Sequence, residues 1–137
     1  MKKLSLLLII MTGLLTFACN KDKKSERFIL LTSTVWTSDS LMANGVEAGD
    51  PGEFLANFNG DAEFYEDGTG YFGAYTGDWR FNTEETEITI ITEEMPLPII
   101  CTIVQLTSAS FKITTVVPDP VNTSENVNVR MTFKPKE

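Results

Sequence analysis

The chain has 137 residues, of which 42% are hydrophobic, and a formal net charge of −8 at pH 7. This length fits one domain with a hydrophobic core plus a terminal segment, and the acidic balance disfavours nucleic acid, which is bound by Lys and Arg at phosphates. The sequence contains no histidine, which excludes Ser-His-Asp and Cys-His nucleophile pairs and His-ligated zinc or iron.

The N-terminus has the three parts of a secretory signal. A basic start (residues 1–3) precedes a nearly unbroken apolar run (4–15), and Ala18 stands directly before Cys19. The run is shorter than the about 20 apolar residues that cross a bilayer, so it fits a signal peptide. The ending resembles the lipobox of bacterial lipoproteins, although Thr16 stands where that motif usually has Leu. An ordinary cleaved signal or a signal anchor would leave Cys19 unmodified.

The lipobox resemblance implies diacylation of the Cys19 thiol and a protein anchored by lipid in the bacterial cell envelope. The outer membrane is then the expected site, with the chain on its periplasmic side or at the cell surface. We divide the chain into a signal peptide over 1–18, the lipidated Cys and a polar tether over 19–27, and a folded domain over 28–137.

Residues 26–57 are predicted to lead into the domain. Residues 26–31 are expected to form a short helix or turn packed on one end of the fold, and 35–43 form the first strand, ended by Asn44-Gly45. A short helix is predicted over 51–57, because Asp50 can cap it, Pro51 suits its first position and Glu53 completes a capping box. A brief edge strand is the alternative there.

Residues 61–92 read as four short antiparallel strands, because apolar and polar residues alternate between turns rich in Gly, Asp and Asn. A three-residue loop at 66–68, with Gly68 left-handed, is preferred to a two-residue loop. It alone keeps one set of residues on a single face: Ala62, Phe64, Gly70 and Phe72.

Three more strands are predicted at 99–105, 111–117 and 125–134. In the last one Val127, Val129, Met131 and Phe133 alternate with polar residues. Eight sequential strands joined by short turns favour an all-β, eight-stranded antiparallel up-and-down β-barrel with one or two short helices. A two-sheet sandwich is the alternative, although sandwiches usually need Greek-key connections.

Four short motifs resemble the lipocalin-like domains of Bacteroidetes lipoproteins, within the lipocalin and calycin group. They are Trp36 behind a short helix, FYEDGT at 64–69, GDW at 77–79 and IVQLT at 103–107. Thr34 departs from the Gly-x-Trp opening of lipocalins. Lipocalins also stack an Arg on that Trp; Arg130 is the counterpart, but alternation places it on the outer face, so no contact with Trp36 is expected.

The leading hypothesis is a binding protein that is not an enzyme and needs no cofactor or metal, because the chain has no histidine and its acidic residues show neither a converging pair nor the spacing of a calcium loop. A small apolar ligand would enter an interior lined by Trp36, Phe64, Phe72, Trp79, Phe81 and Ile90. The alternative is an interaction module with a filled core that contacts an envelope protein or carbohydrate as an inhibitor or accessory subunit. A cavity large enough for a ligand would favour the first hypothesis, and a filled interior with an exposed tyrosine patch would favour the second.

Three further features carry weaker predictions. Asp39-Ser40-Leu41 resembles the short O-glycosylation acceptor motif of Bacteroidetes, which would place a sugar on Ser40. A strip of tyrosines is expected on the outer face, either to bind a partner or to cover the sheet: Tyr65, Tyr71 and Tyr75. Cys101 lies in an apolar run and is expected to be a buried free thiol.

Overall fold

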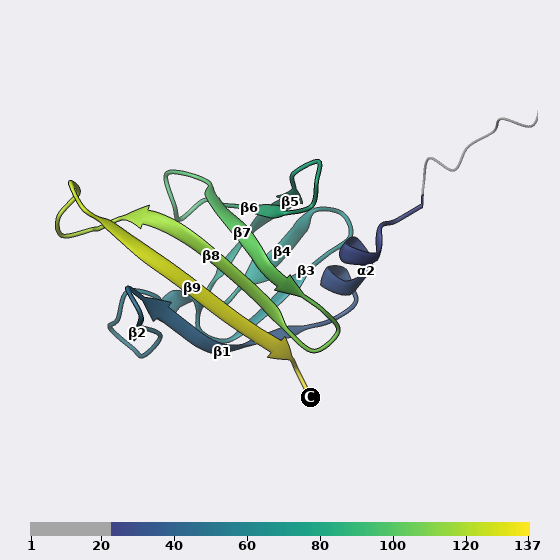
Figure 1. Cartoon of the computed structure of the whole chain (residues 1–137), viewed down its shortest axis with the longest axis horizontal. Helices are drawn as coiled ribbons and strands as arrows, with labels where there is room; N and C mark the ends of the chain where they lie inside the picture. The colour runs from purple at the N-terminus through teal and green to yellow at the C-terminus, as the bar shows by residue number, and fades with distance from the viewer. Residues whose placement is uncertain (1–22) are drawn as a thin grey trace, which may run out of the picture.

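Residues 23–137 are described by a computed structural model, and they form a closed antiparallel barrel with a short helix at one end (Figure 1). The predicted signal peptide, Cys19 and the first part of the tether lie outside these residues. The strands are β1 (Trp36–Ala43), β2 (Val46–Glu47), β3 (Asp61–Phe64), β4 (Thr69–Phe72), β5 (Tyr75–Phe81), β6 (Glu87–Thr92), β7 (Ile99–Leu106), β8 (Phe111–Pro118) and β9 (Asn126–Pro135). Helix α2 is Glu26–Thr32, and η1 is a single 3-10 turn at Ala56–Phe58.

The barrel closes because β1 pairs with β9 as well as with β3, while every other barrel strand pairs with its neighbours in the chain. Strand β2 lies outside this circle as an extra strand on β1. The predicted eight-stranded up-and-down barrel is therefore confirmed, with one α-helix in the described part of the chain. Closure leaves the barrel strands without free edges.

The β3–β4 hairpin has the predicted register. Ala62 pairs with Phe72 and Phe64 with Gly70, and Gly68 adopts a φ of 88° in the three-residue loop. All four paired residues are buried. Local alternation and one glycine were enough to predict which face of this hairpin enters the core.

The following turn corrects the predicted tyrosine strip. Only Gly73 and Ala74 separate β4 from β5, so Phe72 pairs with Tyr75. Cross-strand partners share a face, and Tyr75 therefore lies on the inner side with Phe72, whereas Tyr71 is on the outer side. The prediction that Tyr75 faces outward was wrong.

The predicted helix over 51–57 was also wrong, although its capping contact forms. The Glu53 carboxylate accepts from the Asp50 backbone N–H at 3.0 Å. Gly52, however, has a φ of 90°, a left-handed conformation that ends the helix before its first turn. The segment continues through turns until η1, the only helical turn in this segment.

The first hairpin turns at Asn44 and Gly45, whose φ angles of 50° and 80° are those of a type I′ turn. Strand β2 returns along β1 for two residues. On the opposite side of β1, Arg130 of β9 pairs with Met42, whereas Trp36 pairs with Pro135. Arg130 is exposed on the outer face, as alternation predicted. Its partner Met42 lies six residues from Trp36 along β1, so no contact between Arg130 and Trp36 is expected from this register.

Candidate binding surfaces of the barrel

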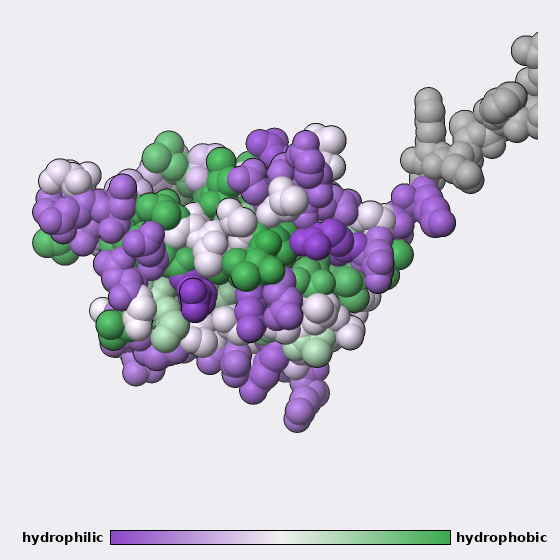
Figure 2. All heavy atoms as spheres, in the orientation of Figure 1, coloured by the Kyte–Doolittle hydropathy of each residue, from purple (hydrophilic) through white to green (hydrophobic). Residues whose placement is uncertain are grey.

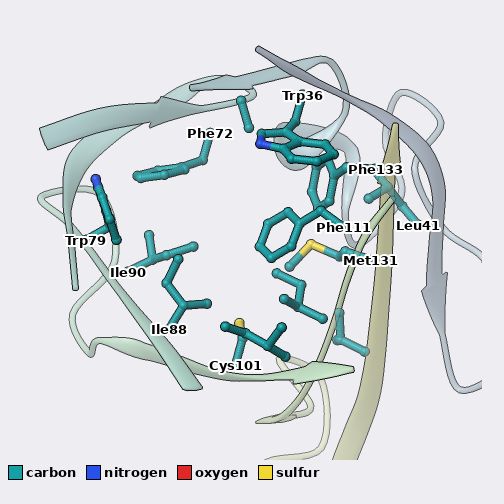
Figure 3. Packing of buried hydrophobic residues seen from close by; sticks show 14 of the residues in the cluster. Trp36, Leu41, Phe72, Trp79, Ile88, Ile90, Cys101, Phe111, Met131 and Phe133 are labelled. Atoms are coloured by element: carbon teal, nitrogen blue, oxygen red, sulfur yellow. The ribbon is translucent and has the colours of Figure 1, made fainter. Parts of the chain in front are cut away.

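The six predicted interior residues belong to one cluster inside the barrel. Figure 3 shows four of them there: Trp36, Phe72, Trp79 and Ile90. Five are buried, and Phe81 is partly buried against them. Phe64 is central: its ring lies 5.1 Å from that of Phe72 and 5.6 Å from that of Trp79, in tilted and edge-to-face arrangements. Such aromatic pairs add stability beyond the apolar area they bury.

Both indole N–H groups are already used. Trp36 Nε1 donates to the Leu31 carbonyl at 3.2 Å, and Trp79 Nε1 donates to the Tyr65 carbonyl at 3.0 Å. A polar ligand group inside the barrel would have to compete with these backbone carbonyls. The interior therefore offers apolar contact and no free indole donor.

The middle of the barrel is filled. The void there measures about 10 Å³, room for about one water-sized sphere, whereas ligand pockets measure about 300–1,000 Å³. The sequence pattern placed Met131 and Phe133 on one apolar face, but it did not show how much of the interior the side chains of β8 and β9 fill. Phe111 packs 5.6 Å from Trp36, 5.7 Å from Phe64 and 5.7 Å from Phe133.

Helix α2 covers one end of the barrel. Ser25 Oγ accepts from the Phe28 N–H at 3.0 Å as an N-cap and donates to Glu85 at 2.6 Å. Phe28 packs 5.7 Å from Trp79, and Leu31 is fully buried. These contacts confirm the short helix predicted over 26–31.

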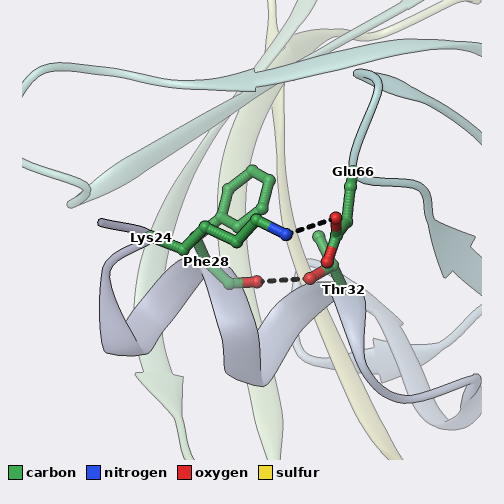
Figure 4. Close-up of polar contacts among 4 residues, drawn as sticks. All are labelled: Lys24, Phe28, Thr32 and Glu66. Carbon is green, nitrogen blue, oxygen red and sulfur yellow. Dashed lines mark hydrogen bonds and ion pairs between the residues drawn. The ribbon is translucent and has the colours of Figure 1, made fainter. Parts of the chain in front are cut away.

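One ion pair also links the start of α2 to the β3–β4 turn (Figure 4): Lys24 pairs with Glu66 in that turn. A second polar contact lies within the helix, where Thr32 Oγ1 donates to the Phe28 carbonyl at 2.8 Å. The ion pair is half exposed, so it contributes little stability of its own. The buried face of α2 is what holds the end of the barrel closed.

The region around η1 covers the other side of the aromatic core. Phe58 packs 4.9 Å from Tyr75, whose hydroxyl oxygen accepts from Asn57 Nδ2 at 3.1 Å. Phe58 also lines the small void together with Phe72. The inward turn of Tyr75 thus has a packing role.

A hollow lies on the outer face, across β7, β8, β9 and β1. It measures about 460 Å³ and is open to solvent. Its lining is Met42, Gly45, Ile100, Thr102, Thr114, Thr115, Val116, Asn128, Val129 and Arg130. Figure 2 shows apolar and pale, moderately polar atoms over this face, with hydrophilic atoms around them. We call this hollow the outer groove.

Two tyrosines remain on the outer face elsewhere. The rings of Tyr65 and Tyr71 lie 6.4 Å apart. Partial burial, followed by the nearby Glu63 carboxylate, raises the pKa of both phenols. The pair is smaller than the predicted strip and covers the sheet beside Glu63.

The remaining predicted groups give little chemistry. Cys101 is buried and free, and burial raises the pKa of its thiol to about 12, so it is a poor nucleophile. Ser40 Oγ donates to Glu47 at 2.6 Å, and its glycosylation remains a prediction. Within residues 23–137, no three Cys, Asp or Glu side chains gather as metal ligands. No helix in that range has the length and apolarity needed to cross a membrane.

Comparisons with known proteins add no relative. No family model matches the chain, and no curated protein is similar to it. The resemblance to lipocalin-like domains therefore stays a prediction from the short motifs.

Proposed function

We propose that this chain is a lipid-anchored envelope protein of the lipocalin-like type, and that its barrel is a binding module without catalytic activity that works through its outer surface. The barrel fold is consistent with a lipocalin-like binding domain. The choice of the outer surface over the interior depends on one observation: the interior void is about 10 Å³, whereas the outer groove is about 460 Å³. The geometry thus supports the filled interaction module better than an interior carrier.

The free energy needed to open the packed aromatic core also favours the outer surface as the binding site. Admission of an apolar ligand would require the aromatic rings around Phe64 to separate, and truncation of a buried Phe or Trp typically costs about 3–5 kcal/mol. Whole domains are stable by only about 5–15 kcal/mol. An interior ligand would have to offset a large share of that stability before it gained affinity.

The anchor is proposed from the lipobox-like ending at Cys19. Ser25 caps α2, and five residues lie between it and Cys19, so this connection spans at most about 20 Å. Acyl chains on Cys19 would hold the α2 end of the barrel towards the membrane. Several acyl chains anchor a protein stably, as a single chain does not.

Labelling with radioactive palmitate in the host tests the anchor. We expect the wild-type chain to incorporate label and to fractionate with membranes, and Cys19→Ala to do neither. Cys101→Ala is the matched control, because its thiol is buried and should leave labelling unchanged. Equal labelling of wild type and Cys19→Ala would remove the anchor from the proposal.

Native mass spectrometry of the chain without its acyl anchor, purified from its own host, tests the choice between interior and surface. We expect to measure either the mass of the polypeptide alone or the mass of a complex whose abundance falls in the surface variant Val116→Thr. An apolar molecule that is retained equally by wild type and Val116→Thr would support binding inside the barrel instead.

A further inference from the structure

The outer groove combines apolar and hydroxyl side chains in rows set by the strand register. One row runs from Thr102 through Thr114 and Arg130 to Met42. Beside it, Ile100 and Val116 are 57% and 58% exposed, so both present apolar surface to solvent. The groove therefore has a polar row and an apolar flank.

Arg130 supplies the charge of this groove. Its register partners are Thr114 and Met42, and none of the carboxylates in residues 23–137 forms an ion pair with it. Glu47 and Glu87 lie at opposite ends of its row, paired with Met42 and Thr102. Among the residues that line the groove, the Arg130 guanidinium thus has hydroxyl, amide and apolar neighbours and no carboxylate.

Positive charge gathers on this side of the barrel. Between Phe28 and Phe111 the only basic residue is Arg80, whereas β8 and β9 bring Lys112, Arg130 and Lys134 to one outer face. Lys112 pairs in register with Thr132, which lies between Arg130 and Lys134. Lys134 is partly satisfied by Asp39 at 3.6 Å, so Arg130 and Lys112 remain as the cations next to the groove.

We propose that the outer groove binds small amphipathic anions, with a carboxylate or phosphate head at Arg130 and a short apolar body against Ile100 and Val116. A guanidinium matches either head group with two parallel N–H donors, and the hydroxyls of Thr102 and Thr114 can add further bonds. Ligand sites typically join an apolar wall to a few placed polar groups, and the groove volume lies within their range. This inference depends on the proposed function, because it names the ligand class of the outer surface.

The test is a calorimetric and NMR titration of the purified chain with octanoate, octyl phosphate and octyltrimethylammonium. We expect both anions to bind and the cation not to bind, with shifts at the methyl groups of Ile100 and Val116. Comparison of octanoate with octyl phosphate identifies the preferred head group. Binding should weaken as salt rises, because the head-group contact is electrostatic and exposed.

Two substitutions and one control locate the site. Arg130→Gln should weaken binding of both anions by about tenfold, the effect of losing a charge-assisted hydrogen bond. Val116→Thr keeps the shape of the side chain and should weaken binding about threefold through lost apolar contact. Arg80→Gln removes another exposed arginine, which lies on β5 and does not line the groove, and should change nothing.

Equal affinities for Arg130→Gln and Arg80→Gln would overturn the assignment, and so would binding of octyltrimethylammonium as tight as that of octanoate. If neither anion binds, the groove assignment fails, but the proposed surface function stands as long as the interior admits nothing. If octanoate instead shifts the buried methyl groups of Ile88 and Ile113, both proposals fail together.

Discussion

At the scale of single residues, Cys101 shows how burial sets chemistry. Its thiol is inside the barrel, next to Thr115, and burial raises its pKa from 9.0 to about 12. The folded state therefore holds the proton in a pH range where the unfolded chain releases it. Ionisation then favours unfolding.

We predict that stability falls above pH 9 because of this thiol. Between pH 9 and about 12 the unfolded chain binds fewer protons than the folded chain, so the free energy of unfolding should drop by about 1.4 kcal/mol per pH unit. Below pH 9 the thiol is protonated in both the folded and the unfolded chain, so the stability associated with the buried neutral thiol is fully present. Urea unfolding of wild type and Cys101→Ala at intervals from pH 7 to 11 measures it.

The informative quantity is the difference in unfolding free energy between wild type and Cys101→Ala. Other groups, including tyrosines and lysines, also titrate in this range and are common to both proteins. The advantage of the wild type should therefore shrink as pH rises. A difference that stays constant from pH 7 to 11 would mean that the thiol titrates normally in the fold.

At the scale of secondary-structure elements, α2 is a lid that stabilises the barrel through its buried face. Leu31→Ala should cost about 2–5 kcal/mol of unfolding free energy, because the Leu31 side chain is fully buried and its truncation opens a cavity in the core. Ile29→Ala, on the exposed side of the same helix, should change stability by less than about 0.5 kcal/mol. Urea unfolding at pH 7 compares them, and similar losses would show that α2 is not a lid.

The elements also show what sequence patterns can predict. The β3–β4 hairpin follows from local alternation and Gly68, and α2 from the short apolar run within 26–31. The prediction of a helix over 51–57 was wrong because Gly52 adopts a left-handed conformation, and the residues beside Gly52 in the sequence do not predict that conformation. Tyr75 was misplaced because the face of a strand depends on the length of the preceding turn, here two residues.

The candidate site was less predictable than the fold. The six interior residues follow from alternation within β1 and β3 to β6, and all six join one cluster. Whether that cluster leaves a cavity depends on the summed volume of side chains from eight strands, including Phe111. The outer groove depends on barrel closure, because β1 and β9 meet only through a long-range pairing.

At the scale of the whole molecule, a closed sheet is filled by its own side chains, covered by α2 at one end, and hollowed on its outer face. Closure removes the barrel edges that could recruit another strand. We therefore expect any ligand or partner to bind outside the barrel.

Methyl NMR in buffer saturated with benzene tests this claim most directly, because uncharged benzene enters dry apolar cavities and has no reason to prefer Arg130. The resonances to follow are those of the interior residues Ile88, Ile90 and Ile113. We predict that they do not shift. Saturable shifts at these methyl groups would show an interior that admits ligands and would contradict the account.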